Sequence, residues 1–239
     1  MRFQFFIPIV IGIGLLTLGC EDKQTSKNKV NASKEDSIAV KSKAKKSTKT
    51  KSEPKFPLLT DANAMEFFLE YEKENKEDKV RITTDFGTID ILLYDKTKFH
   101  RANFIYLTKR NYFANTQFYR VINDFVIQGG SSDDYNIAKR RQKIGHYLLP
   151  PDTKRGYTHK RGAVSMPSSE IENAYKLASP FQFFIIQRQG GASYLDGDYT
   201  VFGEVIDGMD VVDKIAQVET DEGEWPLQNV YIRSVEIIN

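Results

Sequence analysis

The chain has 239 residues, of which 40% are hydrophobic and 28% charged, and its formal net charge is +2. The charge is unevenly distributed: without the basic N-terminal part, the remainder carries about −5, which argues against a nucleic-acid partner for the folded domain. The single cysteine, Cys20, excludes an internal disulfide.

Residues 1–20 have the features of a secretory signal peptide: a basic start, a short apolar run over residues 5–16, and a glycine before Cys20. A bacterial lipoprotein is cleaved and acylated at such a cysteine. The usual motif has leucine three residues before the cysteine and a small residue two before it, whereas Thr17 and Leu18 stand here in the reverse order. We predict an exported envelope lipoprotein acylated at Cys20. An ordinary signal peptide cleaved elsewhere and an uncleaved anchor are the alternatives.

Residues 21–56 are rich in lysine and serine and contain almost no large apolar side chain. Eleven lysines against five acidic residues in residues 21–55 give this part a net charge of +6. Such a segment cannot bury a core, and self-repulsion keeps it extended, so we predict a disordered tether between membrane and domain. A polybasic site for anionic lipid or nucleic acid is less favoured, because no aromatic residue lies between the lysines.

Residues 57–79 are predicted to form a helical extension. Met65, Phe68 and Leu69 recur at helical spacing among acidic residues, which is typical of an amphipathic helix. We expect its apolar side to pack on the outside of the chain's own domain. The alternative is a face that binds a partner.

The predicted domain covers residues 80–239 and begins with a hairpin over residues 80–94 and a helix over residues 97–109. Residues 118–130 then read as two short strands around an Asn-Asp turn. This apolar run contains Arg120 and Gln128. A desolvated guanidinium is costly unless it is paired. Arg120 is therefore either a structural residue with a partner at a barrel rim or a catalytic residue facing a cleft.

The rest of the domain alternates loops and short elements. We predict a polar surface loop with short strands at residues 131–160, strands at 162–166 and 181–186, an amphipathic helix at 207–216 and a last strand at 230–238. The fold is thus mainly β: an antiparallel barrel closed by its termini and capped by two helices, with the extra N-terminal helix. The histidines have no metal-ligand spacing, so no metal site is predicted.

These motifs together resemble the cyclophilin signature. Phe118 and Arg120, then Phe125, then the Gln-Gly-Gly run at 128–130 follow at the family's spacing, and four further segments follow in the family's order: 162–166, 182–185, 194–197 and 201–205. The resemblance implies a closed eight-stranded antiparallel barrel and peptidyl-prolyl cis/trans isomerase activity. It also implies proline-containing polypeptides as clients, no cofactor, and a monomer.

The resemblance also assigns roles to residues. It makes Arg120 the donor to the prolyl amide and includes Phe125 and Gln128 in the catalytic set, with Gln128 orienting Arg120 or the peptide backbone. The implied substrate-binding residues are Val126, Pro167, Ser168, Gln182, Phe184, Tyr194, Leu195 and Tyr199. For the apolar members of this set, core packing is the alternative role.

The sequence departs from the family's pattern in the predicted groove. Pro167 and Ser168 replace an Ala-Asn pair that binds the substrate backbone, and Pro167 has no N–H to offer. Tyr194 replaces a common tryptophan and Tyr199 a common histidine. We therefore expect weak cyclosporin sensitivity and an altered peptide preference. Two hypotheses follow: an isomerase that assists the folding of exported proteins, or a non-catalytic module that binds proline-containing segments or acts as a chaperone.

Overall fold

The computed structural model describes residues 56–168 and 173–239. The predicted signal peptide, Cys20 and all of the predicted tether except Phe56 lie outside the described residues.

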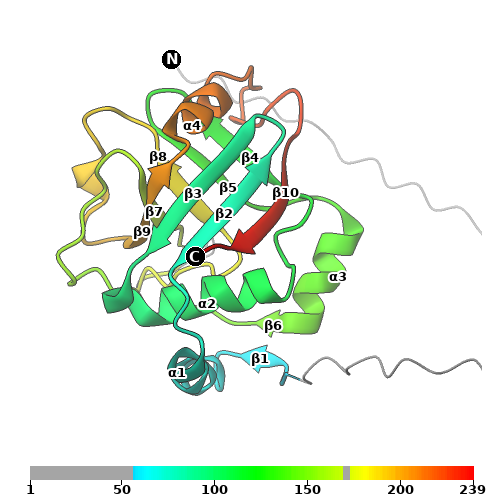
Figure 1. Ribbon diagram of the computed structural model, residues 1–239, viewed down its shortest axis with the longest axis vertical. Helices are drawn as coiled ribbons and strands as arrows, with labels where there is room; N and C mark the ends of the chain where they lie inside the picture. Colours follow the sequence, from blue (N-terminus) through cyan, green and yellow to red (C-terminus); the bar gives the residue numbers. More distant parts are fainter. Residues whose placement is uncertain (1–55, 169–172) are drawn as a thin grey trace, which may run out of the picture. The chain divides into compact units, whose positions relative to one another are not determined.

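Eight antiparallel strands form a closed barrel (Figure 1). They are β2 (Lys79–Thr84), β3 (Gly87–Leu93), β4 (Thr116–Ile122), β5 (Val126–Ser131), β7 (Ala163–Met166), β8 (Phe183–Ile186), β9 (Thr200–Asp207) and β10 (Val230–Ile237). Their order around the barrel is β10-β2-β3-β9-β7-β8-β5-β4. The last strand, β10, pairs with both β2 and β4 and so closes the ring. The predicted eight-stranded antiparallel barrel is confirmed.

The barrel interior is filled by the apolar residues that alternate along the strands. Val80 and Ile82 of β2 and Ile89 and Ile91 of β3 are fully buried. Successive side chains of a strand point to opposite faces, so this alternation places one face of each strand inside. The predicted N-terminal hairpin is confirmed with its buried face.

Two helices cover the ends of the barrel. Helix α2 (Lys98–Lys109) lies at the lower end in Figure 1 and α4 (Met209–Ala216) at the upper end. A short 3₁₀ turn, η1 (Asp95–Thr97), leads into α2. Phe104 of α2 packs on Phe183 of β8 and Phe202 of β9. The two predicted capping helices are confirmed.

The predicted N-terminal helix is α1 (Ala64–Glu74), which packs against α2. Phe68 is fully buried, with its ring centroid 5.8 Å from that of Tyr106. Glu72 forms a buried ion pair with Arg101 at 2.8 Å. The pKa of Glu72 is lowered mainly by its hydrogen bond from Lys76, with a smaller contribution from Arg101. The buried side of α1 therefore packs on its own domain, as expected.

The prediction of a surface loop with short strands at residues 131–160 is wrong in one part. Residues in this stretch form α3 (Tyr135–Ile144), followed by β6 (Gly145–His146), which pairs in parallel with β1 (Leu59–Thr60) outside the barrel. Gly145 has a φ of 134°, and a Cβ at this position would lie 1.9 Å from the carbonyl oxygen of Leu59. Only glycine allows this close approach between the extension and the domain.

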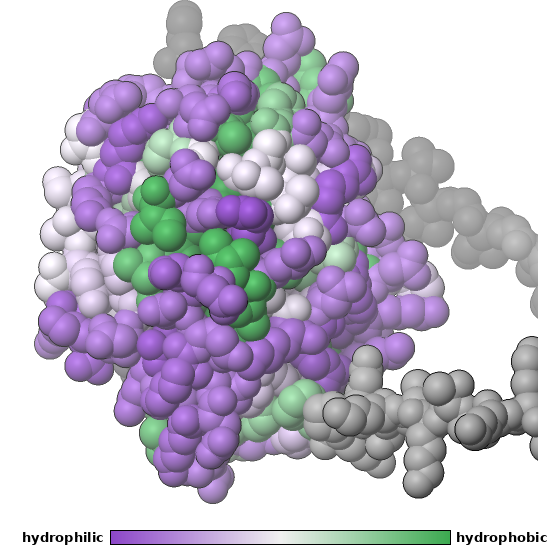
Figure 2. Space-filling view, viewed as in Figure 1, coloured by the Kyte–Doolittle hydropathy of each residue, from purple (hydrophilic) through white to green (hydrophobic). Residues whose placement is uncertain are grey.

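The surface in Figure 2 is mainly hydrophilic, with a limited apolar patch near the middle of the face that carries β2 and β3. Within residues 56–168 and 173–239, no helix has the length and apolar character needed to cross a membrane.

Candidate functional site

The candidate site begins with an irregularity in β4. Phe118 pairs with Gly129 and Arg120 with Gln128, so two steps along β4 match one step along β5 and Tyr119 is the extra residue of a β-bulge. Phe118 and Val121 are both buried, three residues apart instead of two. The bulge shifts the alternation by one residue, so Arg120 lies on the outer face of the barrel.

A row of directly paired residues runs across five strands from Arg120. Arg120 pairs with Gln128, Gln128 with Phe184, Phe184 with Ser165, and Ser165 with Val201. Residues directly opposite each other on neighbouring antiparallel strands have side chains on the same face. The fold thus aligns the predicted guanidinium, amide and aromatic ring of the site on one surface.

Arg120 has a carboxylate partner. Its Nε donates to Oε2 of Glu224 at 2.6 Å, and the two side chains are 37% and 42% exposed. Within the described residues, the two terminal nitrogens of Arg120 form no hydrogen bond. Arg120 thus has a carboxylate partner, as a structural residue would. Its side chain is also partly exposed and has terminal nitrogens without partners among the described residues, as a catalytic residue would require.

Gln128 contacts a different residue from the one expected. Nε2 of Gln128 donates to the hydroxyl of Tyr119 and not to Arg120. The predicted role of Gln128 in orienting Arg120 is therefore not supported by a direct hydrogen bond. The ring centroid of Tyr119 lies 5.6 Å from that of Trp225, the neighbour of Glu224. One loop therefore contacts both Arg120 and the partner of Gln128.

The apolar residues of the predicted site gather in a cluster that is separate from the barrel core. Val126 and Phe184 are buried in it, and Phe125, Leu195 and Tyr199 pack against it while partly exposed. The 3₁₀ turn η2 (Ser193–Leu195) carries Tyr194, which is 62% exposed and stacks on Phe125 at 6.0 Å. These six residues form an apolar surface beside Arg120 and Gln128.

Next to Phe184, a series of hydrogen bonds that the sequence analysis missed connects the exposed Asp196 through the buried His159 to the buried Ser165. The ring of His159 stacks on Phe184 at 5.9 Å, with Nδ1 2.6 Å from Oδ1 of Asp196 and Nε2 3.1 Å from Oγ of Ser165. Burial lowers the pKa of His159, against the opposing effect of Asp196. Ser165 also donates to the carbonyl of Thr200 and has no exposed surface, so it cannot attack an external substrate. His159, fixed by its two hydrogen bonds, therefore packs against the ring of Phe184.

Three predicted residues lie outside this cluster. Pro167 and Ser168 follow β7, where the carbonyl of Pro167 accepts from the N–H of Ser179 at 2.7 Å and Ser168 bridges to Ala178. Gln182 is half-buried just before β8. Pro167 and Ser168 thus follow the end of β7, and Gln182 precedes the start of β8.

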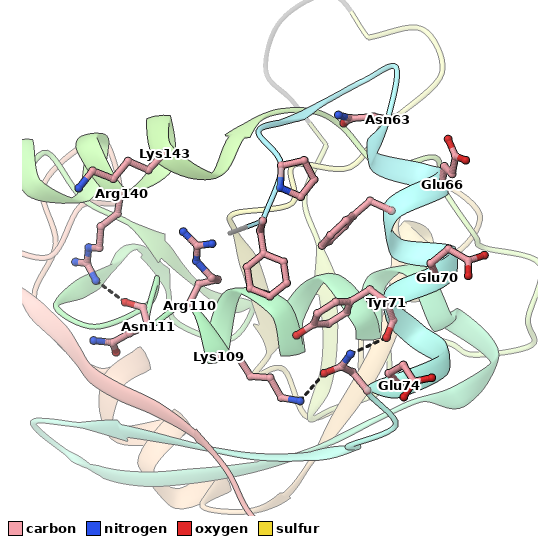
Figure 3. Close-up of a pocket in the computed structure, with 14 residues that line it drawn as sticks. Asn63, Glu66, Glu70, Tyr71, Glu74, Lys109, Arg110, Asn111, Arg140 and Lys143 are labelled. Carbon is pink, nitrogen blue, oxygen red and sulfur yellow. Dashed lines mark hydrogen bonds between the residues drawn. The ribbon is translucent and has the colours of Figure 1, made fainter. Parts of the chain in front are cut away.

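A cavity of about 1020 Å³ lies elsewhere, between α1, the end of α2 and α3. Figure 3 shows Glu66 and Glu70 on the α1 side and Arg110 and Arg140 on the opposite side. The guanidinium of Arg110 lies 5.4 Å from the ring centroid of Phe56. No predicted site residue lines this cavity. In the described part of the chain, no group of three His, Cys, Asp or Glu residues could hold a metal ion.

The sequence contained little that could have located Glu224 or Tyr119. Glu224 lies 104 residues from Arg120 in a polar loop, and only the single tryptophan beside it marks that loop as unusual. Tyr119 was inside the quoted motif, but its special position depends on a bulge that alternation alone does not predict.

Comparison with known proteins agrees with this geometry. Residues 79–237 match the family described as cyclophilin type peptidyl-prolyl cis-trans isomerase/CLD. A peptidyl-prolyl cis-trans isomerase of Acinetobacter baylyi is 35% identical over 166 residues, covering 66% of this chain and 84% of that protein. Peptidyl-prolyl cis-trans isomerase B of Escherichia coli is 32% identical over 169 residues, covering 66% and 98%.

Other relatives are longer. The chain spans 30% of the length of a Rhizopus delemar protein, peptidyl-prolyl cis-trans isomerase-like 2, to which it is 34% identical over 169 residues. Among solved structures, a cyclophilin type peptidyl-prolyl cis-trans isomerase of Cryptosporidium parvum superposes with a TM-score of 0.57 at 25% identity, covering 68% of this chain and 98% of that one. Barrel, motif row and sequence matches agree, and the chain belongs to the cyclophilin-type peptidyl-prolyl cis-trans isomerase family.

Proposed function

We propose that this protein accelerates the cis/trans isomerisation of X-Pro bonds in exported or envelope proteins, with Arg120 as the donor to the prolyl amide. The observation that carries the proposal is the row on one barrel face: a partly exposed guanidinium and an amide beside an apolar surface that contains Phe125 and Phe184. A Cryptosporidium parvum relative has a structure described in the presence of the dipeptide Ala-Pro, and this supports the same class of ligand here.

The chemistry needs no nucleophile. Amide resonance gives the peptide bond a rotation barrier of about 18–20 kcal/mol, and X-Pro bonds exchange in tens of seconds or longer. Isomerisation in milliseconds requires a rate gain of about 10⁴–10⁵, or about 5.5–7 kcal/mol. A donor to the prolyl nitrogen localises its lone pair and reduces the double-bond character of the amide.

The arginine alone does not supply this energy. One charge-assisted hydrogen bond contributes about 1.5–3 kcal/mol, so the apolar surface must also hold the twisted amide better than either planar isomer. Phe125, Phe184 and Leu195 offer the ring of proline an apolar surface. The terminal nitrogens of the partly exposed Arg120, which have no hydrogen-bond partner among the described residues, are the donors proposed to act next to this surface.

The test is a protease-coupled isomerase assay on an X-Pro peptide, with the domain from residue 57 onward. We expect an exchange rate that increases linearly with protein concentration. A rate equal to that in buffer, with peptide binding retained, would instead support the non-catalytic binding module. That alternative is favoured by Pro167, whose missing N–H removes a contact to the peptide backbone.

We further propose that the domain is attached to the membrane through an acylated Cys20 and acts in the bacterial envelope as a monomer. The support is the signal-like segment at residues 1–20 and the lysine-rich stretch that separates it from the domain. Clients would then be exported polypeptides that fold within reach of the tether.

A further inference from the structure

We propose that Glu224 is a positioning residue for Arg120, which it holds by Nε so that the terminal nitrogens face the peptide. The inference rests on the proposed function and adds a residue to it. The contact is a hydrogen bond of 2.6 Å between Nε and Oε2. A guanidinium has five N–H donors in a fixed plane, so fixing Nε sets the direction of the remaining four.

Glu224 is itself held firmly on β4. Its carbonyl accepts from the N–H of Val121 at 2.9 Å, next to Arg120 in the chain. Asp221 closes the loop around it by accepting from the N–H groups of Gly223 and Trp225, each at 2.9 Å. Because the backbone of Glu224 is fixed, its carboxylate can hold the Arg120 side chain in one orientation.

The backbone of Glu224 is in an unfavourable conformation for a glutamate. Its φ is 66°, in the left-handed region that glycine and asparagine adopt more readily. Strained residues of this kind cluster at functional sites, where the side chain is needed at that place. An exposed ion pair adds little to folding stability, so stability does not explain a glutamate here.

The same loop supports the other polar residue of the row. Trp225 packs beside Tyr119, and the hydroxyl of Tyr119 accepts from Gln128. The loop between α4 and β10 therefore reaches Arg120 directly and Gln128 through one intermediate. The family motif contains Arg120 and Gln128 but neither Glu224 nor Trp225.

The variant that tests the proposal is Glu224→Gly, because glycine suits the backbone conformation and removes only the side chain. We expect thermal stability to be equal or higher, and kcat to fall about tenfold to a hundredfold, the effect of a misdirected donor. Glu224→Gln, which keeps a neutral acceptor for Nε–H, should recover part of the loss. Glu222→Ala removes a charge from the same loop without a contact to Arg120 and serves as the matched control.

Two measurements separate positioning from a general structural effect. In a double-mutant cycle, Glu224→Gly should have no further effect on the rate once Arg120→Ala is present. The NMR signal of the Arg120 Nε–H should be protected from solvent exchange in the wild type and in Glu222→Ala, and lose protection in Glu224→Gly. Equal rate losses with and without Arg120, or an unchanged Nε–H signal, would overturn the proposal.

The activity of the wild-type protein tests the proposed function independently of the role of Glu224. If the wild-type protein does not accelerate isomerisation, the proposed activity fails, and the Nε–H signal alone then decides whether Glu224 holds Arg120.

Discussion

At the scale of single residues, Arg120 combines a paired nitrogen with two nitrogens that lack partners within the described residues. Its ion pair with Glu224 is partly exposed and lies on the outer face, not inside the barrel. A guanidinium that is held at one end and open at the other is suited to repeated binding and release of a peptide. An arginine whose whole fork was occupied would be suited only to a structural role.

Arg120→Ala should lower kcat/KM for an X-Pro peptide by about 10²–10³, the scale of losing one preorganised donor. The fold should survive, because the side chain is partly exposed. The measurement is the coupled isomerase assay beside circular dichroism. Arg233→Ala, which removes an exposed arginine paired with Asp85, is the control and should keep full activity. Equal activity of the Arg120 variant would remove this residue from the mechanism.

His100 is a second residue with a measurable consequence. It is fully buried in α2, neither ring nitrogen has a hydrogen-bond partner within the described residues, and burial lowers its pKa to about 4. The unfolded chain protonates this histidine near pH 6.5, whereas the folded chain remains neutral until about pH 4. Stability should therefore fall as the pH decreases through this window, by about 3 kcal/mol in total.

His100→Leu should remove this loss. Denaturant unfolding at pH 7 and pH 4 is the measurement, and the variant should show a smaller decrease in unfolding free energy than the wild type. His146→Gln changes an exposed histidine and should keep the wild-type decrease. If the wild type and His100→Leu depend on pH equally, His100 is not the source of the acid sensitivity.

The family resemblance named several residues that lie together in the structure, but the sequence did not reveal their contacts. Phe125, Phe184, Leu195 and Tyr199 come together as the resemblance implied. The partner of Arg120 is 104 residues away, and no local pattern connects the two. Pairings between residues so far apart depend on how the barrel closes, which periodicity does not encode.

At the scale of elements, alternation and helical spacing were sufficient where one face is clearly apolar. Strands β2, β3 and β10 and helices α1, α2 and α4 follow from such patterns, whereas the segment of β9 was quoted only for its place in the family's motif order. Helix α3 was missed because only Ile137 and Ile144 of its ten residues are buried, leaving too little apolar periodicity to distinguish it from a charged loop. Asp134 caps its first turn, and Arg140 in its middle donates to the carbonyls of Asn111 and Ala114.

Helix α1 lies outside the residues that match the family, yet it is packed as part of the domain. Phe68→Ala should lower the unfolding free energy by about 3–5 kcal/mol, because it leaves a cavity between α1 and α2. Leu69→Ala, one position along the same helix but 40% exposed, should cost less than about 1 kcal/mol. Denaturant unfolding compares the two, and similar small effects would show that α1 is only loosely attached.

At the scale of the whole molecule, the domain and the N-terminal segment are predicted to have separate tasks. Cys20→Ser, expressed with the full signal sequence in a bacterium, should move the protein from the membrane fraction to the soluble envelope fraction. The isomerase activity per molecule should be unchanged, since the site lies on the barrel. Continued recovery in the membrane fraction would indicate an uncleaved anchor instead of an acylated cysteine.

Ring closure has a consequence for synthesis. The strand that joins the two open edges, β10, is synthesised after the other seven strands of the barrel, because it follows them in the chain. Until it arrives, β2 and β4 each present an unpaired edge, and nascent chains with such edges are prone to join one another. Glu224 emerges only a few residues earlier. A chain that has not reached this point lacks both the strand that closes the barrel and the ion pair of Arg120 with Glu224. Barrel closure and positioning of Arg120 therefore occur together, late in synthesis.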